Sequence, residues 1–145
     1  MILQFADPHL IKWSLGFVRE GATARPATSS MRTYAGNTWL PGGRELLVST
    51  NPDSLTLPER LLGGAALYAL DTQTGRVRPF LRWAGRSVFA PLVSPDGSSV
   101  AFLTSNDLDV GFAQTEIGIV RLRGSDADGT PRLLTEAFDR SPGGL

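Results

Sequence analysis

Cysteine is absent from the 145 residues, and histidine and lysine occur once each, as His9 and Lys12. No disulfide, thiolate nucleophile or zinc site built on cysteines or paired histidines can therefore form within this chain. A phosphate-binding loop ending in lysine is also excluded, because no glycine precedes Lys12. The chain thus lacks the side chains on which many metalloenzymes and nucleotide hydrolases depend.

An excess of either charge is also absent, since 14 basic residues balance 14 acidic ones. The basic residues are dispersed, so the sequence predicts no nucleic-acid partner and no anionic membrane surface as a partner. No apolar run approaches the roughly 20 residues of a spanning helix, and we expect no membrane insertion. The first residues lack the pattern of a signal peptide. The residues do not determine the compartment, which is cytoplasmic unless the parent protein is exported.

The sequence does contain an internal repeat. Glycines at positions 21, 75 and 129 are equally spaced, and arginines at positions 32, 86 and 140 have the same spacing, which we call the repeat interval. A second match agrees with it: Pro41-Gly42-Gly43 precedes Pro95-Asp96-Gly97 by one repeat interval, and an apolar run follows each triplet. A fixed period of this length indicates stacked or radially arranged supersecondary units.

Short apolar runs between turn residues favour an all-β fold. In the better-preserved unit the sequence predicts strands over Val88–Val93, Val100–Thr104, Ile117–Leu122 and Arg132–Thr135, with a turn at residues 125–129 before the last strand. Four antiparallel strands per unit are typical of a β-propeller blade. Trp39 stands one repeat interval before Val93 on the first strand, so we expect it to pack between blades.

The repeat predicts a partial β-propeller with about two complete four-stranded antiparallel blades and incomplete ends. Residues 1–29 would be the last two strands of a preceding blade, residues 30–83 and 84–138 the two blades, and residues 139–145 the start of another. A closed ring needs about 4 to 8 blades. We therefore expect the chain to be a piece of a longer polypeptide, or else to close a ring by self-association.

The strings SPDGSSVAF at Ser94–Phe102 and PRLLT at Pro131–Thr135 resemble the repeat of TolB-like propellers, a WD40-like group. The other copy departs from this pattern at Leu40–Gly43 but fits it at Leu67–Asp71 and Thr74-Gly75. Similar repeats occur in the non-catalytic propellers of prolyl-oligopeptidase-type serine peptidases. The resemblance implies a propeller fold and, because such proteins are often exported, a periplasmic or extracellular location for the parent protein.

The residues indicate no catalytic constellation. The serine of such peptidases lies in a Gly-x-Ser-x-Gly elbow, which is missing, since Ser87 follows Gly85-Arg86 without the second glycine. His9 has no nucleophile near it in the sequence. The sequence therefore predicts a chain that is not itself an enzyme and needs no cofactor, although its parent protein could be a serine peptidase.

Two groups of residues are candidate binding positions. Asn106 and Asp107 lie in a predicted loop, and Asp107 with Asp109 is a weak candidate for a hard cation such as calcium, although no calcium-loop spacing is present. The repeated Arg32, Arg86 and Arg140 would either line a central channel and bind an acidic peptide or bridge blades through a carboxylate such as Asp96.

These observations lead to two hypotheses about function. The first is a non-catalytic scaffold for protein or peptide interaction, with contacts on the loops Asn51–Gly64 and Asn106–Thr115 and at the repeated arginines. The alternative is the substrate-gating propeller of a prolyl-oligopeptidase-type serine peptidase whose catalytic domain is not in this chain.

Overall fold

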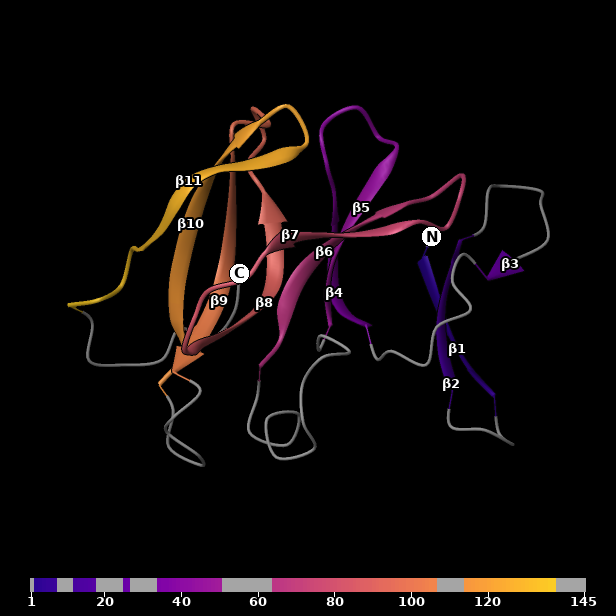
Figure 1. Ribbon diagram of the computed structural model, residues 1–145, viewed down its shortest axis with the longest axis horizontal. Coiled ribbons are helices and arrows are strands. Elements are labelled where there is room, and N and C mark those ends of the chain that lie inside the picture. Colours follow the sequence, from indigo (N-terminus) through magenta and orange to yellow (C-terminus); the bar gives the residue numbers. More distant parts are fainter. Residues whose placement is uncertain are drawn as a thin grey trace.

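The computed structural model describes residues 2–7, 12–17, 25–26, 34–50, 64–106 and 114–137, with side chains from residue 36 onward. These residues form three antiparallel sheets (Figure 1). No helix within the described ranges is long and apolar enough to cross a membrane. The all-β class expected from the sequence is confirmed.

Two of the sheets have four strands each, joined in sequence order. The first sheet consists of β4 (Tyr34–Trp39), β5 (Glu45–Thr50), β6 (Ala66–Asp71) and β7 (Val77–Leu81). The second consists of β8 (Arg86–Val93), β9 (Ser99–Asn106), β10 (Glu116–Arg123) and β11 (Asp126–Leu133). Each is a four-stranded antiparallel meander, as the repeat predicts for propeller blades.

The third sheet, nearest the N-terminus, contains β1 (Ile2–Asp7), β2 (Lys12–Phe17) and β3 (Arg25–Pro26). The sequence predicted two strands in this region. The structure adds a third strand, because residues 2–7 pair with residues 12–17 along their whole length.

Equivalent turns join the first two strands of each blade. The amide of Gly43 donates to the Leu40 carbonyl and that of Gly97 to the Ser94 carbonyl, closing both turns. Gly97 has a φ of +69°, a conformation that glycine adopts without steric cost. The two turns also lie against each other, since a Cβ on Gly97 would stand 3.2 Å from Pro41 Cγ.

The predicted turn at residues 125–129 is wrong. The chain reverses earlier, at Gly124 and Ser125, and β11 begins at Asp126. Two residues suffice for the reversal because Gly124 adopts a φ of +65°. Gly129 instead lies within β11, where the pairing with β10 is interrupted by a bulge.

The longer β10–β11 hairpin restores the repeat interval between the fourth strands of the two blades after it is lost between the third strands. Leu47 and Ala101 stand one repeat interval apart, but their partners on the third strands, Ala69 and Ile119, stand four positions closer together. Ala69 in turn pairs with Arg78 and Ile119 with Arg132, and these two arginines are again one full interval apart. A shorter connection before β10 is therefore compensated by a longer β10–β11 hairpin.

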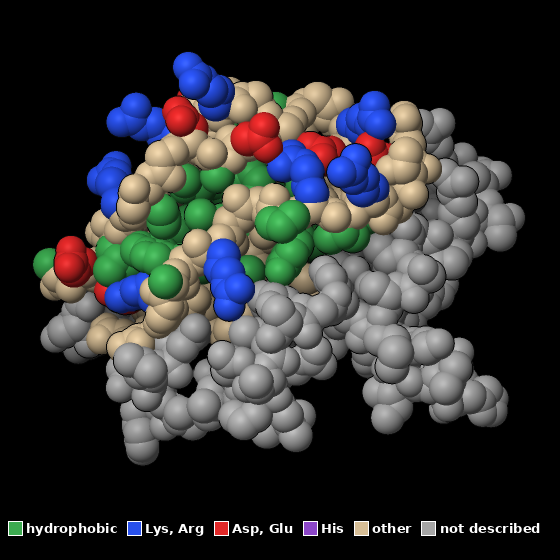
Figure 2. Space-filling model, in the orientation of Figure 1, with side chains coloured by type: hydrophobic (Ala, Val, Ile, Leu, Met, Phe, Trp, Pro, Cys, Tyr) green, Lys and Arg blue, Asp and Glu red, His purple; other side chains and the backbone are tan. Residues whose placement is uncertain are grey.

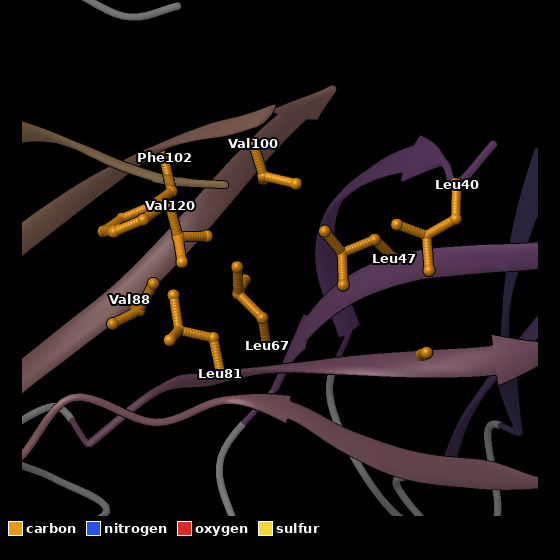
Figure 3. Close-up of a cluster of buried hydrophobic side chains, with 9 residues drawn as sticks. Leu40, Leu47, Leu67, Leu81, Val88, Val100, Phe102 and Val120 are labelled. Atoms are coloured by element: carbon orange, nitrogen blue, oxygen red, sulfur yellow. The ribbon is translucent and has the colours of Figure 1, made fainter. Parts of the chain in front are cut away.

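The main hydrophobic core lies between the two four-stranded sheets (Figure 3). Burial of each large apolar side chain of this kind contributes about 1.5–3 kcal/mol. The first sheet and its turn supply Leu40, Leu47, Leu67, Ala69 and Leu81, and the second supplies Val88, Val100, Phe102 and Val120.

Trp39 does not occupy this core. Its backbone pairs with Leu46 as that of Val93 pairs with Val100, which confirms the predicted register. Its side chain, however, is 44% exposed, while the adjacent Leu40 is buried. Neighbouring residues of an extended chain point to opposite sides, so Leu40 takes the core position that the sequence assigned to Trp39.

Candidate functional site

Arg86, the described member of the repeated arginines, makes its contacts within the second sheet. Its Nη1 donates to Glu116 Oε2 at 2.6 Å, across β9. The guanidinium also lies over the Trp83 ring, 5.2 Å from its centroid, and Trp83 meets Phe102 edge-on. Arg86 is thus held by a carboxylate and an aromatic ring of the chain itself. Arg32 and Arg140 lie outside the described residues.

Asp96 is not the carboxylate that pairs with Arg86. It accepts hydrogen bonds from the Ser94 and Ser98 hydroxyls at 2.6 and 2.7 Å and from the Ser98 amide at 3.1 Å. These bonds lower the pKa of Asp96 to about 2, and the bond from the Ser94 hydroxyl contributes most. For Arg86 the expected bond to Asp96 is thus not formed, because this carboxylate closes its own turn. A bridge between blades through Arg32 or Arg140 stays a prediction.

The candidate cation site is only partly described. Asn106 ends β9 and pairs with Arg86 along the backbone. Asp107 and Asp109 lie outside the described residues, as does most of each loop expected to carry contacts. Within the described ranges no three His, Cys, Asp or Glu side chains gather in a metal-binding group.

Arg78, on β7, forms an ion pair that bridges the two blades. It donates from Nε and Nη2 to the Glu45 carboxylate at 2.9 and 2.8 Å, and from Nη1 to Asp126 Oδ1 of the second sheet at 2.7 Å. Nη2 also donates to the Ser125 carbonyl at 2.8 Å. The hydrogen bond from Arg78 lowers the pKa of Glu45, although burial opposes this change.

The second sheet has an apolar face directed away from the first. Because Val88, Val100 and Val120 point into the core, alternation directs their neighbours to the opposite side. We call this surface the outward face; it comprises Phe89, Leu92, Ala101, Leu103, Ile117 and Ile119.

The outward face is more accessible than its counterpart on the first sheet. There, Leu47, Leu67 and Ala69 are at most 1% exposed, and the second sheet covers them, chiefly through β8. On the outward face Leu92 is 49% exposed, and Ile117 and Ile119 are half-buried. Hydrophobic side chains among arginine side chains are visible on the molecular surface in Figure 2.

A hollow of about 510 Å³ opens beside the outward face, where β11 bulges away from β10. Arg121 and Arg132 are exposed, and neither has a carboxylate partner among the described residues. The hollow thus combines two cations, hydroxyl groups and one carboxylate beside an apolar surface. Its lining includes Ser99, Ile119, Arg121, Asp128, Thr130 and Arg132.

Arg121 and Arg132 were not among the candidates predicted from the sequence. A signal for Arg132 was present, because it follows Arg78 by one repeat interval. Arg121 carried no such signal, since its structural counterpart, Asp71, is not one repeat interval away and bears the opposite charge.

No protein-family model matches the sequence, and no curated protein matches it. Solved structures do share its fold. A puromycin-hydrolyzing peptidase of Mycobacterium tuberculosis is 19% identical with a TM-score of 0.61, over 91% of this chain and 23% of the peptidase. A protein assigned as TolB from Agrobacterium tumefaciens is 22% identical with a TM-score of 0.56, over 88% and 41%. A puromycin hydrolase is 19% identical with a TM-score of 0.60, over 92% and 22%.

These similarities confirm the TolB-like propeller fold that the sequence resemblance implied. The chain is an all-β propeller segment with two complete four-stranded blades. It spans less than half the length of each of these structures.

Proposed function

We propose that this propeller segment has no catalytic activity of its own and serves as a rigid scaffold that binds a protein or peptide. The outward face is the observation that carries this proposal. It places an accessible apolar surface on a sheet whose other face is fixed by the interblade core. Leu92 is exposed there, and exposed apolar surface marks interaction sites in soluble proteins.

The proposal is tested by selecting displayed random peptides on the 145-residue protein and measuring their affinity for variants. Leu92→Asp places a charge on the outward face at an exposed position, and we expect it to weaken binding at least tenfold. Trp39→Ser removes a similarly exposed apolar side chain elsewhere and serves as the matched control. Failure to select any peptide, or equal affinity for wild type and the Leu92 variant, would refute this scaffold role.

The alternative is that the segment gates substrate access in a serine peptidase. Its support is that two of the similar structures, with TM-scores of 0.61 and 0.60, are a puromycin-hydrolyzing peptidase and a puromycin hydrolase. The coding sequence beyond Leu145 tests this alternative. An α/β segment with a Gly-x-Ser-x-Gly elbow in the same reading frame would favour gating, whereas its absence would count against it.

A further inference from the structure

We propose that Ser87, held in place by Thr104, acts as a clamp between the two blades. Its hydroxyl fixes the chain at Gly64 and Ala65, just before β6 begins, against the first strand of the second sheet. The clamp goes beyond the proposed scaffold role, because it holds the blades together whatever partner they bind. It is supported by the contacts of this hydroxyl, by its burial and by the recurrence of hydroxyl residues at the same position of the repeat.

The clamp joins two consecutive residues of β8 to two consecutive residues of the first blade. Ser87 Oγ accepts a hydrogen bond from the Gly64 amide at 2.6 Å and a longer one from the Ala65 amide at 3.3 Å. The Val88 amide in turn donates to the Ala65 carbonyl at 2.8 Å. Gly64 has a φ of +81°, which glycine adopts without steric cost. The chain can therefore bring both amides to the same hydroxyl.

Thr104 of β9 holds Ser87 from within the second blade. Its Oγ1 donates to the Ser87 carbonyl at 2.8 Å. Thr104 is fully buried and Ser87 is only 4% exposed, so water has little access to these bonds. A buried group that loses its partner keeps the cost of leaving water, and such bonds therefore constrain the backbone strongly.

The clamp also occupies backbone groups at the free edge of the second sheet. β8 is an edge strand of that sheet, and the outer amides and carbonyls of an edge strand need partners. The bond from Val88 to Ala65 provides one near the start of β8. Near its end the Val93 amide donates to Thr38 Oγ1 at 3.4 Å. The first blade thus binds this edge near both ends, and Ser87 secures the end that faces β6.

Hydroxyl residues recur at both positions of the clamp. Thr33 and Ser141 stand one repeat interval before and after Ser87, and Thr50 stands one interval before Thr104. This recurrence indicates a role in how the units of the repeat are joined. Thr50 is buried like Thr104, but its hydroxyl has no hydrogen-bond partner among the described residues. The two threonines are therefore a matched pair, one bonded within the clamp and one not.

Amide hydrogen exchange, measured by NMR on the isotope-labelled 145-residue protein, tests the clamp. Ser87→Ala should speed exchange of the Gly64 and Ala65 amides by about tenfold or more, because both lose their acceptor. The amides of the central strand β9 are the internal reference and should change less. Unchanged exchange at Gly64 and Ala65 would overturn the inference. An equal acceleration in β9 would also overturn it, because it would show only a general loss of stability.

Thr104→Val provides a second test, since it nearly preserves the shape of the side chain and removes the donor to the Ser87 carbonyl. It should speed exchange of the Gly64 and Ala65 amides by about threefold or more. Thr50→Val is the matched control, the same change at the equivalent residue, and should leave these two amides unaffected. Equal effects of the two valine variants would contradict the part assigned to Thr104.

Discussion

Gly36 of β4 lies against Ala90 of β8, so closely that a Cβ on Gly36 would stand 2.9 Å from the Ala90 Cα. The two residues are equivalent members of the repeat, and each lies in the bulge of the first strand of its blade. Both have positive φ, +60° for Gly36 and +47° for Ala90. The contact between these bulges fixes how closely the first strands approach.

Gly36→Ala should therefore destabilise the protein for two reasons. Positive φ costs a non-glycine residue about 1–2 kcal/mol, and crowding of the Ala90 backbone adds about 1–3 kcal/mol. Gly43→Ala is the control, since Gly43 has a φ of +65° but open space around its Cβ position. Urea unfolding of both variants measures the difference, and equal losses would show that the bulges are not in tight contact.

A second prediction concerns Gly118, whose Cβ position would overlap the Phe102 ring. Phe102 is fully buried and meets Trp83 edge-on, so the ring has little room to move. Gly118→Ala should cost about 1–3 kcal/mol of unfolding free energy. Adding Phe102→Leu should cost less in the Gly118→Ala background than in wild type, and a double-mutant cycle measures this coupling. Strict additivity would contradict the overlap.

Arg78→Met should reduce stability by about 1.5–3 kcal/mol, because it leaves the Glu45 carboxylate without its hydrogen-bond donor. The bond to Asp126 should matter less, since Asp126 is 74% exposed. Asp126→Asn should cost at most about 1 kcal/mol. Chemical denaturation of the two variants tests the ranking. A larger loss from Asp126→Asn would mean that the bond between the sheets, rather than the bond to Glu45, dominates.

The acid sensitivity of the Pro95–Gly97 turn follows from Asp96. Its folded pKa, about 2, is below the ordinary value of 3.8. Its contribution to stability should therefore be complete above about pH 4 and lost as pH falls toward 2. Asp96→Asn should lower the melting temperature at neutral pH, and the gap to wild type should close as pH falls from about 4 to 2. Asp71 titrates similarly in both proteins, and a gap independent of pH would refute this role.

The sequence predicted the fold well because the residues of the turns and the repeat interval can both be recognised directly in the sequence. Pro95-Asp96-Gly97 forms the expected turn, and the four-stranded units follow from the repeat interval. Partners distant along the chain were not predictable. Arg86 bonds Glu116, 30 positions away, because the register of β8, β9 and β10 brings them together. Arg78 bonds Asp126, 48 positions away, because the two sheets pack against each other.

The residues of the candidate site were likewise hard to predict from the sequence. Arg121 takes its place from the shortened connection before β10, which no ungapped comparison of the two repeats can detect. The exposed side chain of Trp39 was also missed, because a sequence register gives the strand position but not which of two adjacent apolar residues enters the core.

Equivalent residues of the third strands, β6 and β10, stand four positions closer together than the repeat interval. This offset determines where segments of the two blades could be exchanged. Exchanging segments at the repeat interval within β5 and β9 joins equivalent positions. The same interval applied within β6 and β10 joins positions four residues apart, about 13 Å along a strand. Because four is even, the faces would keep their sides while the ends of the sheet shifted. A chimaera cut there would preserve its apolar pattern and lose the alignment of its turns.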